Sequence, residues 1–185
     1  MSKQETSVSL TPEKRQMLTQ ELTFIQTQGA ESFQRIINEN EDKNFFQRLC
    51  SNKLKRSITL IDNYKTSFAK LSDYRNDLFL EHYKFYMQYR VIEPIGEIFH
   101  CFHSLEEKIT TSDEILFKKI LGILENTGIH VFKIGQEVFY DFKSMKTDGG
   151  LSLSEKDGKR IDSVECCMYA TRGKDFLWPA SVILV

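Results

Sequence analysis

The chain has 185 residues, of which 41% are apolar and 28% charged, as in ordinary globular proteins and unlike disordered or collagen-like ones. Its 25 Lys and Arg nearly balance its 26 Asp and Glu, and the net charge of −1 disfavours a strongly basic function such as specific nucleic-acid binding. No run of about 18 apolar residues occurs, and residues 1–11 are polar, unlike a secretion signal. The sequence therefore predicts a cytoplasmic protein with no membrane partner.

A long helical region is predicted because neither Gly nor Pro occurs between Gly29 and Pro94. As one helix, this region would extend for roughly 95 Å at about 1.5 Å per residue. We favour a break within residues 38–44, where Asn side chains compete for backbone hydrogen bonds and Asp42 can cap the helix that follows. An apolar face before the break predicts a helix that folds back on this stalk. Its residues are Leu18, Leu22, Ile25, Phe33 and Ile36.

Two adjoining apolar stripes run along the second part of the stalk at helical spacing. So wide a face is too large for the rest of the chain to bury, and a second copy is its simplest cover. We therefore expect a homodimer built on a coiled coil. The residues assigned to the dimer contact are Leu60, Tyr64, Leu71, Leu78, Phe85, Ile95 and Ile98.

The periodicity changes twice after the stalk. Two shorter helices are expected within residues 94–128, the second capped by Ser112 or Asp113 and ended by Gly128. Six of the nine glycines then lie between residues 128 and 173, among short β-favouring runs. Strands are expected at 130–134, 138–142, 164–170 and 177–185, with turns at 148–150 and 157–158. The prediction is an α+β chain with a polar tail (1–12), a helical stalk (13–93), a helical pair (94–128) and a compact β-domain (129–185).

Four strings occur in chain order at Asp73–Asn76, Val91–Ile98, Ile120–Ile129 and Phe176–Val185. Each resembles a segment of the GrpE family, the nucleotide exchange factors of DnaK-class chaperones. In that family they are the end of a long dimeric helix, the Pro that opens a four-helix bundle, the second bundle helix, and the terminal strand. The resemblance spans about residue 55 to the end. It implies a long dimeric coiled-coil helix, a short helix pair that forms a four-helix bundle in the dimer, a small C-terminal β-domain and no cofactor.

The resemblance also implies a function that needs no catalytic residue. Such a protein binds the open state of the chaperone ATPase domain and thereby weakens its hold on ADP. The chain departs from the family in lacking its Pro and His near Phe139–Met145, and Asp175 and Trp178 stand where the family has arginines. The residues assigned to the chaperone contact are Tyr74, Arg75, Phe139, Tyr140, Asp141, Asp175 and Trp178.

Two other functions remain open from the sequence. One is a non-catalytic coiled-coil adaptor that keeps this fold and binds a different partner. The other is an enzyme, although no Walker, H-E-x-x-H or G-x-S-x-G string occurs. A deep pocket with two or more perturbed titratable groups would favour that interpretation.

The remaining motifs have ordinary interpretations beside their functional ones. His100, Cys101 and His103 could begin a zinc site, but no second ligand pair follows, and we expect no bound metal. The four cysteines lack the spacing of a disulfide framework, and adjacent Cys166 and Cys167 would point to opposite faces of a strand. A run of basic residues could touch nucleic acid or an acidic partner, or could be a solvated helix face. It comprises Lys43, Arg48, Lys53, Lys55 and Arg56.

Overall fold

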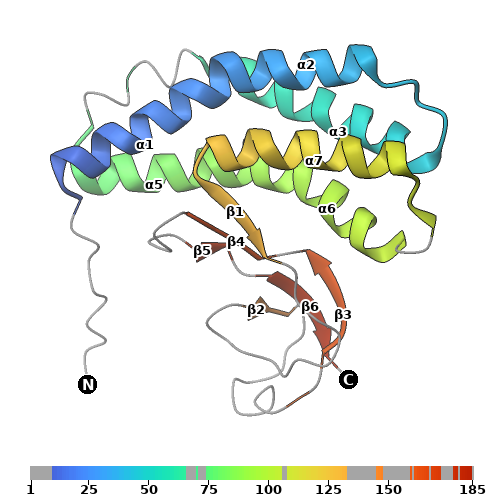
Figure 1. The fold of residues 1–185 in the computed structure, drawn as a ribbon. Coiled ribbons are helices and arrows are strands. Elements are labelled where there is room, and N and C mark those ends of the chain that lie inside the picture. The colour runs from blue at the N-terminus through green and yellow to red at the C-terminus, as the bar shows by residue number, and fades with distance from the viewer. Residues whose placement is uncertain are drawn as a thin grey trace.

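The computed structural model describes residues 10–65, 70, 74–105, 108–132, 145–147, 159, 161–166, 168–171, 177–178 and 180–184. The helices form one layer, and the strands lie together below it, joined to it through β1 (Figure 1). For the strands after β1, side-chain positions are described only at Met145. Within the described residues, no helix combines the length and apolar character needed to cross a membrane.

The first helical limb joins α1 (Pro12–Phe24), a π-helical turn η1 (Ile25–Gly29) and α2 (Ala30–Glu39) without an intervening loop. It begins where the Thr11 hydroxyl accepts a hydrogen bond from the Lys14 amide, and Pro12 occupies the first turn, where no amide donor is needed. The five apolar residues expected on its inner face are all buried: Leu18, Leu22, Ile25, Phe33 and Ile36. This limb therefore packs against the rest of its own chain.

The chain leaves the helix at Asn40 and re-enters at α3 (Phe45–Asp62), which packs back against α2. Asn44 caps α3 by accepting from the Gln47 amide at 2.8 Å. Asp42, expected as the cap, instead has a left-handed φ of 52° and accepts from the Ser51 hydroxyl at 2.6 Å. Residues 13–93 are therefore not one uninterrupted rod. The apolar faces of α2 and α3 pack against each other within the chain. A straight stalk could cover these faces only with a second chain.

A second long limb joins α5 (Asn76–Met87), a π-helical turn η3 (Gln88–Ile92) and α6 (Glu93–Leu105). Pro94 lies within this limb instead of opening a separate helix. Proline has no N–H for the carbonyl one turn earlier, which is that of Arg90. The buried Ser57 hydroxyl of α3 donates to this carbonyl at 2.7 Å, so the missing backbone hydrogen bond is replaced from a neighbouring helix.

The helix α7 (Thr111–Asn126) begins and ends with defined caps. Its N-cap is Thr110, two residues before Ser112 and three before Asp113, the caps expected from the sequence, and Asp113 completes a capping box with it. At the other end Gly128 has a φ of +74°, as expected for the residue that stops the helix. An added Cβ there would overlap Oε1 of Glu21 in α1, which shows how closely this turn approaches the first limb.

Within the described residues, six short strands form two three-stranded sheets. They are β1 (Ile129–Phe132), β2 (Met145–Lys146), β3 (Ile161–Cys166), β4 (Met168–Thr171), β5 (Leu177–Trp178) and β6 (Ala180–Leu184). One sheet has the order β1-β4-β5, with both pairs antiparallel. The other has the order β2-β6-β3, where β6 pairs parallel with β2 and antiparallel with β3.

Two of the strands predicted from the sequence are each divided into two strands in the structure. The run 164–170 is divided between β3 and β4, which belong to different sheets, and 177–185 is divided between β5 and β6 around Pro179, which cannot donate to a ladder. No strand was predicted at the position of β2. The expected strand 138–142 and both expected turns lie outside the described residues.

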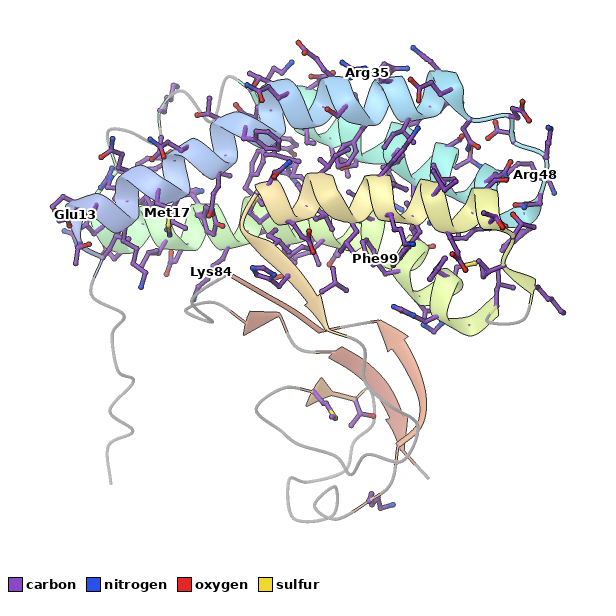
Figure 2. The ribbon with its side chains drawn as sticks, in the orientation of Figure 1. Glu13, Met17, Arg35, Arg48, Lys84 and Phe99 are labelled. Atoms are coloured by element: carbon purple, nitrogen blue, oxygen red, sulfur yellow. The ribbon has the colours of Figure 1, made fainter. Side chains whose placement is uncertain are left out.

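The core of the helical layer lies between the two limbs and α7. Phe99 of α6 is fully buried and meets Phe117 of α7 edge-on at 5.0 Å, and Figure 2 labels it within the layer. Phe102 stacks on the same Phe117 ring at 3.8 Å. Arg35 and Arg48, labelled at its outer side, are exposed (Figure 2).

Candidate interaction surface

The two predicted chaperone contacts on a helix, Tyr74 and Arg75, lie at the start of α5. The Tyr74 ring is partly buried and stacks on His82 at 4.7 Å. Arg75 has 82% of its side chain exposed and pairs with Asp77 at 2.9 Å. The hydrogen bonds that Arg75 donates to the Asp77 carboxylate raise the pKa of Arg75, so the guanidinium remains charged. Tyr74 is therefore chiefly a packing residue, whereas Arg75 can reach a partner.

The start of α5 is held against α1 by side-chain hydrogen bonds. Arg15 donates from Nη1 to Asn76 Oδ1 at 2.8 Å and from Nη2 to the Tyr74 carbonyl at 2.7 Å. Asn76 in turn donates to the Leu10 carbonyl at 3.2 Å. These bonds fix the backbone that carries Arg75 to the first helical limb.

The predicted contacts of the β-region are described only in part. Trp178 lies in β5, where its backbone pairs with Tyr169 of β4. Phe139, Tyr140, Asp141 and Asp175 lie outside the described residues.

The residues predicted to form the dimer contact differ in their exposure to solvent. Tyr64, Leu78 and Phe85 are 41%, 42% and 53% exposed. Leu60 is partly buried, and Leu71 lies outside the described residues. Ile95 and Ile98 are wholly buried in the core of their own chain, so in this conformation they cannot touch a second copy. Their burial follows from the folded-back limbs, because α3 covers the face of α6 that was expected to need a partner.

The exposed group continues into η3, where Tyr89 is 39% exposed and its ring lies 4.5 Å from that of Phe85. We call Tyr64, Leu78, Phe85 and Tyr89 the α5 apolar surface. Single exposed apolar residues are ordinary, but neighbouring exposed aromatic rings are typical of interaction sites. This surface is therefore a candidate site for binding another protein.

Arg90 lies beside the α5 apolar surface and was not singled out from the sequence. It is only 7% exposed, and its Cζ lies 3.5 Å from the centre of the Tyr64 ring. The one signal that could have identified it is its isolation: it is the only charged residue between Lys84 and Glu93.

A cavity of about 320 Å³ lies elsewhere, where α2, the 40–44 loop and the starts of α3 and α7 meet. Its apolar lining is contributed by Ile36, Ile115 and Leu116. The charged side chains at its edge are already paired, Lys119 with Glu39 at 3.1 Å and Lys43 with Glu41. All four of these side chains are more than half exposed, so solvent screens both ion pairs.

The histidine and cysteine motif of α6 is dispersed among aromatic side chains. The His103 ring meets Phe102 at 5.7 Å and Phe117 at 5.8 Å, both edge-on. Burial raises the pKa of Cys50 in α3 well above its usual range and also raises that of Cys101, so both thiols stay protonated. Among the residues whose placement is described, no group of three or more His, Cys, Asp or Glu is arranged to hold a metal ion.

The basic run of α3 is also dispersed. Lys53 pairs with Glu97 of α6 and Lys43 with Glu41, whereas Arg48, Lys55 and Arg56 are exposed on the solvent side of the helix. This arrangement is that of a solvated helix face.

Compared with known protein families, with curated proteins and with solved structures, the chain has no significant match in any of the three.

Proposed function

We propose that this chain is a GrpE-like co-chaperone of the cytoplasm, a non-catalytic homodimer that promotes ADP release from a DnaK-class chaperone. The observation that carries the proposal is where two of the four family-like strings fall. Ile120–Ile129 forms the end of α7, the Gly128 stop and the start of β1, and Phe176–Val185 contains the strands β5 and β6, one in each sheet. Strings that resemble a helix end and a terminal strand thus lie on a helix end and on the last strands.

The exposed Arg75 supports a contact with the chaperone. A guanidinium can form two parallel hydrogen bonds with a partner carboxylate, and Asp77 holds that of Arg75 beside the helix start. A protein that binds the open nucleotide cleft more tightly than the closed one lowers ADP affinity by the same coupling free energy. Exchange therefore needs a positioned surface and no catalytic group.

A second candidate function is favoured by the folded-back limbs. Because α1–α2 and α3 cover much of the second limb, this chain buries within itself surface that a dimeric stalk would share between two copies. The alternative is a non-catalytic adaptor that has kept the order of elements and binds a different partner.

The experiment that separates these functions is stopped-flow release of a fluorescent ADP analogue from the host's DnaK-class chaperones. The proposal expects release to accelerate and to saturate as the protein concentration rises. No acceleration by folded protein, with every chaperone copy of the host tested, would support the adaptor. Light scattering in the same buffer reports whether the active species is a dimer.

Variants connect the activity to the proposed contacts. We expect Arg75→Ala and Trp178→Ala each to weaken chaperone binding by about 1–3 kcal/mol, as for interface anchors. The matched control is Arg35→Ala, an exposed arginine of α2 far from Arg75 in sequence. Equal loss in all three variants, or loss of helicity, would show that the effect is not a specific contact.

A further inference from the structure

Arg90 is a buried cation with which no carboxylate of the described residues forms an ion pair. Its residue exposure is 7%, and its Nε is sealed from solvent with no hydrogen-bond acceptor. The ion pairs of the described residues involve other side chains, so the contacts given for this guanidinium are aromatic ones. A buried charge is costly unless an opposite charge or hydrogen bonds compensate it, so this arrangement needs a reason.

The surroundings of Arg90 hold its position without neutralising it. Its Cζ lies 3.5 Å from the centre of the Tyr64 ring, 5.6 Å from Phe85 and 6.0 Å from Tyr86. Aromatic faces attract a guanidinium but supply no carboxylate-like acceptor. Tyr64 and Phe85 are themselves exposed, and Tyr89 extends the rim, so the cation lies among aromatic rings that reach solvent.

We propose that Arg90 and the α5 apolar surface form a docking site for a carboxylate of a partner protein, on a segment that also carries an apolar residue. The outer nitrogens of a guanidinium form a planar fork that matches the two oxygens of a carboxylate. The exposed rings would cover the apolar residue beside it. Aromatic residues and arginine are also the types that contribute most to binding energy at protein interfaces.

The charges around the site favour a single carboxylate over a phosphate chain. Burial raises the pKa of Tyr86, and Arg90 and Asp62 are both near enough to act on it in opposite directions. Asp62 thus brings a negative charge to the site, although Lys65 pairs with it at 2.6 Å. Nucleic acid binds through several cations at once, and here one unpaired cation lies beside an acid.

The docking site does not depend on exchange activity. It would serve an exchange factor or an adaptor equally, and its test contains no chaperone. Failure of the ADP-release experiment therefore leaves this proposal intact, and failure of the docking test leaves the exchange proposal intact.

The test is a titration of the full chain with N-acetyl-phenylalanine, which carries a carboxylate beside an apolar ring. The readout is the Arg90 Nε–H signal in proton–nitrogen NMR, assigned by its loss in Arg90→Lys. We expect a saturable shift with this probe and roughly tenfold weaker binding of N-acetyl-phenylalaninamide, which is neutral. Equal binding of both compounds, or a stronger response to inorganic phosphate or to a single-stranded oligonucleotide, would overturn the proposal.

Variants separate docking from a structural role. We expect Arg90→Lys to weaken binding at least fivefold, because the fork is lost, and Arg90→Met to abolish it while Tm stays equal or rises. Tyr64→Leu should weaken binding, whereas the exposed Arg56→Met of α3 should leave it unchanged. A Tm several degrees lower in Arg90→Met would show that Arg90 stabilises the fold, and it would overturn the proposal. An Arg90 signal that shifts on dilution of the protein alone would assign the surface to a second copy, which also overturns the proposal.

Discussion

Asp113 and Arg90 are both buried charges, 1% and 7% exposed, yet their surroundings are opposite. Asp113 accepts two hydrogen bonds from Asn44, at 3.0 and 3.1 Å, one from Gln47 at 2.9 Å and one from the Thr110 amide at 3.0 Å. Arg90 has three rings beside it and no acceptor for Nε. One charge is fully hydrogen-bonded by its own chain, and the other is not.

The difference indicates what each charge does. Asp113 ties the start of α7 to the start of α3, so its hydrogen bonds stabilise the junction at which both helices begin. An unsatisfied buried cation lowers the stability of the folded chain, and such groups persist where they have a function. Replacement of Asp113 and replacement of Arg90 should therefore change the free energy of unfolding in opposite directions and by different amounts.

The largest effect is expected for Asp113→Ala. It leaves the side-chain donors of Asn44 and Gln47 without an acceptor in a buried place and breaks the capping box. We expect the free energy of unfolding to fall by about 3 kcal/mol in urea titrations, since each unsatisfied buried donor costs about 1–3 kcal/mol. Glu114→Ala, on the exposed neighbour, is the control and should change it by less than about 0.5 kcal/mol.

The same carboxylate predicts a pH dependence. Burial opposes ionisation of Asp113, but hydrogen bonds from Asn44, Thr110 and Gln47 outweigh burial and hold its pKa below the usual range. Because the folded pKa is lower than the unfolded one, about 3.9, the stabilisation is present above about pH 4 and is lost as pH falls through the folded pKa. The stability difference between the parent and Asp113→Asn should therefore shrink below pH 4. A difference that is the same at pH 3 and pH 7 would contradict this account.

A smaller loss of stability is expected where the Ser57 hydroxyl replaces the backbone hydrogen bond that Pro94 cannot donate. Ser57→Ala removes the hydroxyl that donates to the buried Arg90 carbonyl, and we expect unfolding to become easier by about 1–2 kcal/mol. In a Pro94→Ala background an amide is again available, so the same substitution should cost about half as much. Ser104→Ala, whose exposed hydroxyl donates within its own helix, is the control and should be nearly silent.

The helices could be predicted from the sequence where local signals decide. The apolar spacing from Leu18 to Ile36 and the glycine stop at Gly128 both act within one helix, and both appear in the structure. Capping residues were harder, because Asp42, Asn44, Thr110 and Ser112 can all cap, and the choice depends on tertiary bonds such as that from Asn44 to Asp113.

The apolar face of the first limb predicted that this limb folds back, but the sequence did not predict that α3 covers the face of α6 assigned to the dimer. The absence of Gly and Pro permits a long helix but does not select the partner of its apolar face. A stripe that packs on α3 and one that packs on a second copy have the same spacing, so Ile95 and Ile98 were indistinguishable from Phe85 in the sequence. Arg90 was missed for a related reason. Its Nε lacks a hydrogen-bond acceptor only because of the tertiary packing around it, which the sequence does not show.

The smallest effect, and the one that most sharpens the comparison, is expected for Arg90→Met. Methionine keeps the volume of the arginine stem and removes an uncompensated charge, while it gives up cation–π contacts of about 0.5–2 kcal/mol. Because removal of the charge offsets this loss, we expect the free energy of unfolding to stay within about 1 kcal/mol of the parent, on the side of higher stability. Urea unfolding of Arg90→Met and Asp113→Ala measured together checks this. A loss in Arg90→Met as large as that in Asp113→Ala would mean that the rings compensate the cation as fully as Asn44, Gln47 and Thr110 satisfy the carboxylate, and the distinction between the two buried charges would fail.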